Sequence, residues 1–240
     1  MEAKSIIFDK LEGFIKKFYT NELIKGVILF IGLGLLYFIF TLLIEYFLWL
    51  STSGRTILFW LFVGVESFLL IRFIAFPMFK LFKLQQGINY EQASAIIGNH
   101  FSEVQDKLLN FLQLANQSQT SELLAASIEQ KAASLQPIPF SNAVNFAKNK
   151  KFLPYAIIPI LLLILFFVTG NSEIISNSFA RVVNYETKYA PPAPFEFVVL
   201  NKSLTAQQNS DFVLQVKTQG KVMPENIAIQ IGDEEYFLQN

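Results

Sequence analysis

Three long apolar runs stand out in the pattern of hydrophobic and polar positions. The first covers residues 26–44 and the last covers residues 152–170, both without a charge. Between them, residues 56–78 are equally apolar except for Glu66 and Arg72. A helix rises about 1.5 Å per residue and needs roughly 20 residues to cross the hydrocarbon core of a bilayer. The pattern therefore predicts three transmembrane helices.

A cleaved signal peptide is the alternative interpretation of the first run. The apolar part of a signal peptide has roughly 7–15 residues, and this run is longer. The segment before it is also long and carries acidic residues as well as lysines.

Residues 51–55 (STSGR) are typical of a tight turn, so we expect the first two spans to form an antiparallel hairpin.

Basic residues gather at one end of each predicted span. They are Lys10, Lys16, Lys17, Lys25, Arg72, Lys80, Lys83, Lys148, Lys150 and Lys151. The opposite end has Arg55 in the turn and the more distant Arg181 and Lys188. Because Lys and Arg favour cytoplasmic flanks, we expect the N-terminus and residues 80–150 in the cytoplasm. The residues after 170 would then be periplasmic, and the protein would lie in a bacterial inner membrane.

The segments on the predicted cytoplasmic side have helical periodicity. In residues 3–19, apolar side chains recur with the spacing of one helix face. This amphipathic helix would lie either in the headgroup layer or against the other cytoplasmic helices. Asn89 and Gln92 have the spacing of a capping box, which predicts a helix that ends near Gly98. Ser102 would cap the next helix.

Two more cytoplasmic helices are expected. Thr120 or Ser121 would cap the third, which Pro137 and Pro139 would end. Ser141 would begin a fourth that runs into the last span. The four helices would form a small module against the membrane.

Beyond residue 170 the pattern changes from helix to strand. An amphipathic turn or two and a proline-rich linker precede residue 195, after which apolar residues alternate with polar ones. We expect this to be the start of an immunoglobulin-like sandwich, which needs about seven strands and about 100 residues. Either the chain is the N-terminal part of a longer protein, which we favour, or a partner completes the sheet.

The predicted fold class is thus a mainly α membrane protein with three transmembrane helices, a small cytoplasmic helical module and the start of a periplasmic immunoglobulin-like β domain. The expected parts are an amphipathic N-terminal helix at 1–22, a transmembrane hairpin at 23–79 with spans 24–50 and 56–79, a cytoplasmic helical module at 80–150, a third transmembrane helix at 151–170, a periplasmic linker at 171–194 and a partial β-sandwich at 195–240.

Composition narrows the possible functions. Hydrophobic residues make up 52% of the chain and charged residues 16%, against about a quarter charged in soluble domains. The formal net charge is zero, which disfavours nucleic-acid binding. The sequence has no Cys and one His, so thiol chemistry and a His-rich metal site are excluded. No cofactor, metal site or small-molecule substrate is evident, and we expect no enzyme activity.

Glu66 is the strongest candidate for a functional polar residue, because it falls near the middle of the second span. A carboxylate at that depth is costly unless it is protonated, paired or hydrated. It would make a polar contact within the hairpin or to a partner helix, or else serve a proton or ion relay. Glu45 and Arg55 could approach each other near the turn, and Arg72 would lie on a different face from Glu66 and reach toward the interface.

In the cytoplasmic segment, His100 is expected to cap or pack at a helix junction. Asp106 and Lys107 would either contact another helix or a partner, or lie on a solvated helix face.

The stretch IIGNHFSEVQDKLLNFLQL (96–114), followed by SELLAASIEQKAASLQPIPFSNAVNF (121–146), resembles the N-terminal region of a large uncharacterised envelope protein family of Bacteroidota. The resemblance covers nearly all of residues 1–240. It implies members far longer than this chain, with extended periplasmic strand-rich and coiled regions. It implies no activity and no site residues.

These features favour a non-enzymatic inner-membrane anchor or scaffold subunit of a cell-envelope complex. Its expected partners are membrane lipids and other membrane-protein subunits. The alternative is an accessory subunit of a transport or protein-export machine that uses Glu66. A third hypothesis places an enzymatic domain beyond residue 240.

Overall fold

The computed structural model describes residues 2–117, 121–191, 193–205, 211–220, 222, 224, 226–231 and 234–238. The chain divides into two compact units, residues 1–188 and residues 189–240, and each is described by itself. The first unit is helical and the second contains the β-strands.

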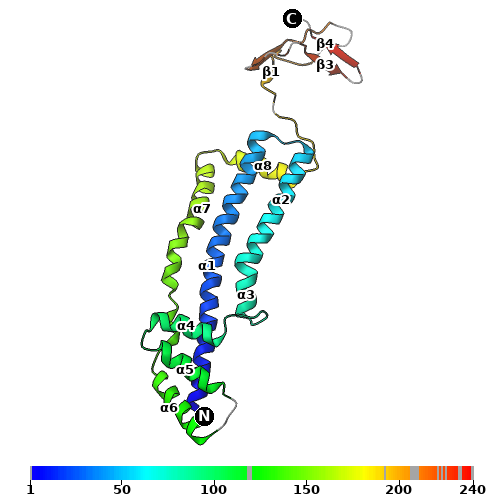
Figure 1. Cartoon of the computed structure of the whole chain (residues 1–240). Coiled ribbons are helices and arrows are strands. Elements are labelled where there is room, and N and C mark those ends of the chain that lie inside the picture. Colours follow the sequence, from blue (N-terminus) through cyan, green and yellow to red (C-terminus); the bar gives the residue numbers. More distant parts are fainter. Residues whose placement is uncertain are drawn as a thin grey trace. The chain divides into compact units, whose positions relative to one another are not determined.

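Three long helices run side by side through the first unit (Figure 1). They are α1 (Glu2–Leu48), α2 (Thr52–Leu70) with its continuation, and α7 (Leu153–Val168). With the helical turns that adjoin them, the three form segments Ala3–Leu48, Thr52–Leu81 and Phe140–Val168. Each segment is long and apolar enough to cross a membrane, which is consistent with a membrane protein. We call the end with the α1–α2 turn the hairpin end of this bundle, and the other the module end.

The amphipathic residues 3–19 are helical, as predicted, but they do not form a separate helix. They are the first turns of α1, which continues for 47 residues into the first apolar run. The reason is local, because residues 19–25 contain no proline or glycine that would end a helix. At about 1.5 Å per residue, α1 is about 70 Å long.

The second long helix contains a π-helical turn near the module end. This turn, η1 (Ile71–Ala75), joins α2 to α3 (Phe76–Leu81). Pro77 lies just after it and has no N–H to donate to the carbonyl of Phe73, which explains the change of hydrogen bonding here. The freed Phe73 carbonyl lies directly against Gly26 of α1, where a Cβ would collide with it. Glycine at this position therefore permits close approach of the two helices.

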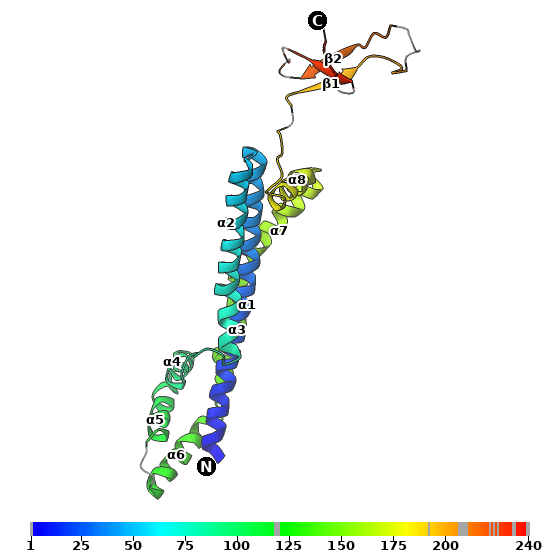
Figure 2. The same ribbon diagram turned by 90° about the vertical axis from the view of Figure 1, so that its right-hand side faces the viewer.

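The module end carries three shorter helices around the start of α1 (Figure 2). They are α4 (Tyr90–His100), α5 (Gln105–Ala115) and α6 (Glu122–Leu135). Together with residues 3–19 of α1 we call them the helical module. Its largest fully buried side chains are Ile7, Leu11, Phe14, Ile97, Leu108, Phe111, Leu112 and Leu135. Of the two placements predicted for residues 3–19, the structure shows packing against the module helices.

Helix starts in the module are partly as predicted. The capping box of Asn89 and Gln92 is confirmed, and Ser121 caps α6 by accepting the Leu124 N–H at 3.1 Å. Ser102 does not cap α5, because that helix begins after Val104 without a side-chain cap. Thr120 lies outside the described residues.

The predicted fourth helix from Ser141 is wrong. Two 3₁₀ segments occupy this stretch, η2 (Phe140–Ala143) and η3 (Phe146–Phe152), before α7 begins. Asn145 separates them and caps η3 through the Ala147 N–H at 2.9 Å. Asparagine side chains that bond the local backbone compete with α-helix formation, which explains the shorter turns.

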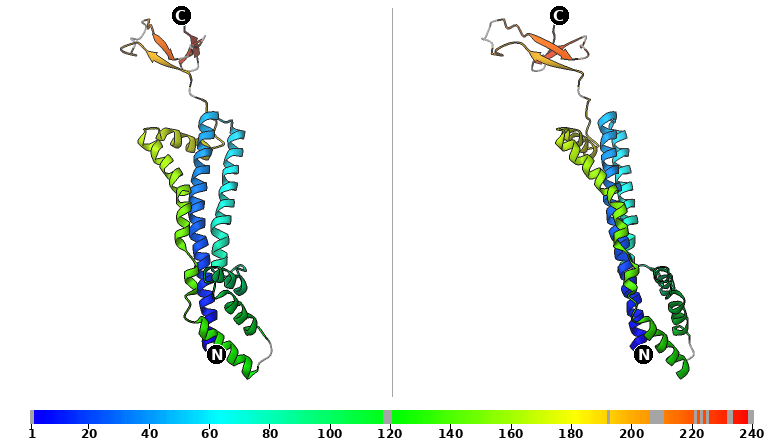
Figure 3. Two further views of the ribbon diagram at one scale, coloured as in Figure 1. Left: turned by 60° about the vertical axis from the view of Figure 1, so that its left-hand side comes forward. Right: turned by 90° about the vertical axis from the view of Figure 1, so that its left-hand side faces the viewer.

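At the hairpin end, α8 (Ser172–Val183) crosses from α7 back to α1 and α2. Figure 3 shows α7 leaning away from α1 toward this end and α8 closing the distance. A second apolar cluster lies here, with Leu42, Leu58, Ile175 and Val182 buried at its centre. The stacked rings of Phe59 and Tyr185, with centroids 4.8 Å apart, extend it.

The second unit contains two small antiparallel sheets. Strand β1 (Phe195–Val199) pairs with β2 (Val216–Gly220), and β3 (Ala228–Ile231) pairs with β4 (Glu234–Phe237). The predicted change from helix to strand after residue 194 is therefore confirmed. Within the described residues of this unit, the structure shows two separate antiparallel pairs of strands, and the immunoglobulin-like domain stays a prediction.

Candidate functional site

Three charged side chains are buried together at the hairpin end. They are Glu45 of α1, Arg55 of α2 and Arg181 of α8, which we call the ion cluster. Their exposed fractions are 0%, 1% and 6%. Charged residues are almost never fully buried unless they are paired. We therefore expect specific contacts to compensate for the burial of this cluster.

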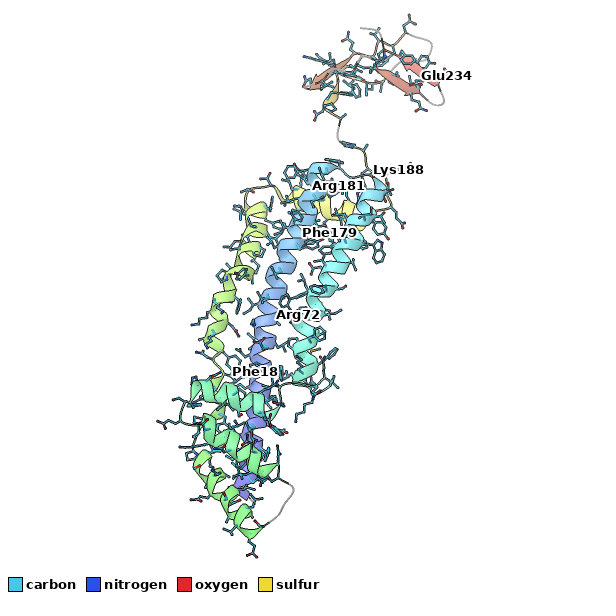
Figure 4. All side chains as sticks on the ribbon, viewed as in Figure 1. Phe18, Arg72, Phe179, Arg181, Lys188 and Glu234 are labelled. Atoms are coloured by element: carbon cyan, nitrogen blue, oxygen red, sulfur yellow. The ribbon has the colours of Figure 1, made fainter. Side chains whose placement is uncertain are left out.

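One carboxylate oxygen holds both arginines. Arg55 donates from Nε to Oε1 of Glu45 at 3.1 Å, and Arg181 donates from Nε to the same oxygen at 3.2 Å. Two guanidinium groups thus meet at one acceptor, and the three residues come from three different helices. Figure 4 labels Arg181 on α8, at the hairpin end.

The remaining arginine donors reach backbone and hydroxyl oxygens. Arg55 donates from Nη2 to the Leu50 carbonyl and from Nη1 to the Thr187 carbonyl, both at 2.8 Å. Arg181 donates from Nη2 to the Ser178 hydroxyl at 3.3 Å. Arg55 therefore links the Leu50 carbonyl, between α1 and α2, to the segment after α8, in addition to its ion pair.

Trp49 covers the cluster. Its ring lies 4.1 Å from the Arg181 guanidinium, a cation–π contact. Trp49 has a φ of 43°, in the left-handed region that non-glycine residues rarely adopt. Such backbone strain persists where the surroundings fix the conformation, and here the guanidinium under the ring is one such restraint.

The charges of the cluster do not balance. One carboxylate faces two guanidinium groups, and Oε2 of Glu45 is buried without a hydrogen-bond partner among the described residues. A buried ion pair gains little over apolar packing, but removing one partner leaves an uncompensated charge and is costly. The arrangement suits a structural latch that fixes the registry of three helices.

The sequence pattern singled out Glu45 and Arg55 as neighbours but did not include Arg181. A signal was present, because Arg181 falls on the same face of α8 as the buried Ile175, Ser178 and Val182. An arginine on the apolar face of a short amphipathic helix indicates a buried acceptor elsewhere. Sequence spacing alone did not identify Glu45 as that acceptor, since 136 residues separate the two.

Glu66 lies apart from the ion cluster. Its carboxylate packs on Gly34 of α1, where a Cβ would lie 2.9 Å from Oε2. Its Oε1 is buried and has no hydrogen-bond partner within the described part of the chain. The side chain as a whole is half-buried. The structure thus places Glu66 between the two helices of the hairpin without giving it an ionic partner.

The other candidate residues are spread along the first unit. Arg72 is exposed in η1, with its guanidinium 5.9 Å from the Phe73 ring centroid, and lies closer to the module end than Arg181 does (Figure 4). His100 is the last residue of α4, and its ring packs edge-on to Phe101 at 4.7 Å. Asp106 and Lys107 are exposed on α5. The structure does not bring these residues together with Glu66 or with the ion cluster.

Among the described residues, no three His, Asp or Glu side chains come close enough to hold a metal ion. Comparison with family models, with curated proteins and with solved structures gave no match to this chain. The resemblance to the Bacteroidota envelope family therefore stays a prediction.

Proposed function

We propose that this protein is a non-enzymatic inner-membrane anchor or scaffold subunit of a bacterial cell-envelope complex, which links a cytoplasmic helical module to a periplasmic β-rich arm. The observation that carries the proposal is the continuity of α1. The same helix supplies Ile7, Leu11 and Phe14 to the core of the helical module and Glu45 to the ion cluster. One rigid element thus joins two packed structures at opposite ends of the bundle.

The lengths agree with this role. The roughly 30 Å of hydrocarbon takes up about 20 residues of a helix, and α1 has 47. The remaining turns form part of the helical module, so that module is attached without an intervening loop. Lysines and arginines flank the three apolar helices mainly at the module end, which supports a cytoplasmic module under the positive-inside rule.

The β unit would form part of a periplasmic immunoglobulin-like domain. Its antiparallel pairs and alternating apolar side chains support this assignment. Exposed apolar residues on the strands, such as Phe197 and Ile231, are of the kind that a facing sheet would cover.

The orientation is tested with reporter fusions to the full chain. A periplasm-specific reporter fused after Gly170 should be active, and a fluorescent protein that folds in the cytoplasm should be dark at the same position. The reverse pair of results would contradict the proposed orientation.

The scaffold role is tested by co-purification in mild detergent with quantitative mass spectrometry. Exchanging the charges of the exposed α5 pair, as Asp106→Lys with Lys107→Glu, keeps the net charge. It should lower the amount of co-purified partner subunits at least tenfold. Exchanging Glu122 and Lys131 on α6 in the same way is the matched control and should retain them. If the wild-type chain purifies alone, the scaffold role fails.

A second function, an accessory subunit of a transport or export machine, is favoured by one observation. Glu66 has a buried oxygen without a partner in the described residues, at a depth where carboxylates are costly. Glu66→Gln keeps the shape and removes the charge. Loss of transport with intact assembly would support this second function, whereas loss of assembly, or no effect at all, would favour the scaffold.

A further inference from the structure

A groove of about 1060 Å³ lies between α1 and the loop that connects α3 to α4. Its floor is the stretch of α1 from Glu12 to Tyr19, and its wall is residues 80–90. The loop is held to α1 by the Ile88 N–H, which donates to the Tyr19 hydroxyl at 2.7 Å, and by Lys83, which pairs with Glu12 at 2.9 Å. The groove is therefore part of the packed structure and not a gap beside a loose loop.

The charge of the groove is positive. Lys16, Lys80 and Lys83 line it, against a single acidic lining residue, Glu12. The Lys83 ammonium and the Tyr90 hydroxyl lower the pKa of Glu12, and Glu12 in turn raises the pKa of Lys83. Both members of that pair stay charged near neutral pH, which leaves Lys16 and Lys80 as the excess positive charge.

Several polar groups of the groove, besides the lysines, can donate hydrogen bonds. Tyr19 is 5% exposed and lines the groove. Its oxygen accepts the Ile88 N–H, and among the described residues no acceptor takes its own proton. The side-chain amides of Gln85 and Gln86 also line the wall. Ammonium, phenol and amide donors around one groove suit an anion with several oxygen atoms, such as a phosphate.

Exposed apolar side chains stand beside these donors. Phe82 is 66% exposed and Leu84 is 75% exposed, both in the groove wall. They directly follow the last apolar turn of the second long helix, at the level where a bilayer would give way to headgroups. A ligand with both a phosphate and acyl chains matches this combination of lysines and apolar surface, whereas a free phosphate would leave the apolar side chains uncovered.

The turn that forms the wall has an unusual residue. The Leu84 N–H donates to the Phe79 carbonyl at 2.8 Å, and the Lys83 N–H donates to the Lys80 carbonyl at 3.3 Å. This is a Schellman ending of α3, and its left-handed position, at which glycine is preferred, is taken by Lys83 with a φ of 58°. The Lys83 side chain leaves this position to pair with Glu12, so that the turn and α1 are joined at the groove.

We propose that this groove binds the phosphate headgroup of an anionic phospholipid, with Lys16, Lys80 and the Tyr19 hydroxyl as its ligands and with the acyl chains against Phe82 and Leu84. The site is separate from the ion cluster. It does not depend on which compartment the module end faces.

The test uses the full chain reconstituted in vesicles of phosphatidylcholine and phosphatidylglycerol in equal amounts. The protein is extracted in mild detergent, and the retained lipids are quantified by mass spectrometry. The wild-type chain should retain phosphatidylglycerol over phosphatidylcholine. Lys16→Gln with Lys80→Gln should reduce this preference roughly 25-fold, since each lysine near a lipid phosphate contributes about a fivefold effect.

Two further variants separate binding from folding and from general electrostatics. Lys148→Gln with Lys150→Gln removes the same charge from exposed positions at the same end of the bundle but outside the groove, and should keep the preference. Lys83→Gly relieves the left-handed backbone and should fold normally. Because it leaves the Glu12 carboxylate without its partner, the excess positive charge of the groove falls by one, and phosphatidylglycerol retention should fall about fivefold. Equal loss in the Lys148 and Lys150 variant would overturn the proposal. So would equal retention of both lipids by the wild-type chain, or displacement of phosphatidylglycerol by inorganic phosphate, which would identify a phosphate site without acyl contacts.

Discussion

The two packed ends of the bundle are built in different ways. The helical module has an apolar core, and the ion pair of Glu12 with Lys83 beside it is largely exposed. The hairpin end has a smaller apolar cluster, and its charges are fully buried at the centre. The module is thus held by burial of apolar area, which is tolerant of small shifts. The hairpin end is held by directional contacts, which accept one arrangement of α1, α2 and α8.

The largest effect is expected from Glu45→Ala. The substitution leaves two buried guanidinium groups without a counter-charge, which should destabilise the hairpin end by about 3–5 kcal/mol. Limited proteolysis in detergent should then cut between α7 and α8, and the thermal unfolding temperature should fall. Glu173→Ala, an exposed carboxylate on α8, is the control and should leave both readouts unchanged. If the two variants behave alike, the ion cluster is not a latch.

In the module, Leu108→Ala should cost about 2–4 kcal/mol. Leu108 is fully buried in the module core, and its truncation removes apolar contacts and leaves a cavity. Hydrogen exchange should show faster opening of α4–α6 and unchanged protection of α8. Leu109→Ala, the neighbour that is 37% exposed, should have a much smaller effect. Loss of protection at both ends would show that the two structures unfold as one unit.

Gly26→Ala probes the close contact of α1 with η1 of the second long helix. A methyl group here would collide with the backbone carbonyl of Phe73, which cannot rotate away as a side chain could. We expect a loss of about 1–3 kcal/mol, typical of overpacking, measured as a lower unfolding temperature in detergent. Gly64→Ala, which has open space around it, is the matched control and should be neutral or slightly stabilising.

The smallest effect is expected from the exposed pair of Glu12 and Lys83. The pKa of Glu12 is lowered in the folded state, so its contribution is present above the usual carboxyl pKa and is lost as the pH falls through the folded value. Glu12→Gln should therefore be slightly less stable than the wild type at neutral pH. The two unfolding temperatures should converge in acid. Glu103→Gln, also exposed, should not show this convergence.

Much of the first unit could be predicted from its sequence, because run length and helix capping are local signals. The three apolar helices follow from long apolar runs, and the start of α4 follows from the spacing of Asn89 and Gln92. The strands follow from the change to a two-residue period after residue 194.

The failures have non-local or competing causes. Residues 3–19 continue into the first span because no residue between them ends the helix. A search for helix start signals does not detect such continuity. The 3₁₀ segments before α7 reflect asparagines that compete with helix formation. Arg181 joined the ion cluster through packing of α8, and no spacing rule pairs it with Glu45.

Because α1 is unbroken, an insertion or deletion in its middle changes the rotation of one end of the helix relative to the other. Each residue added to a helix turns everything beyond it by about 100°. One alanine inserted after Leu33 would swing Glu45 away from its two arginines while Ile7 and Leu11 stayed seated. Seven residues inserted at that point would bring the carboxylate back to within about 20° of its original direction, although about 10 Å further along the axis. The length of the middle of α1 thus fixes the angle between the side chains that α1 presents to the helical module and those that it presents to the ion cluster.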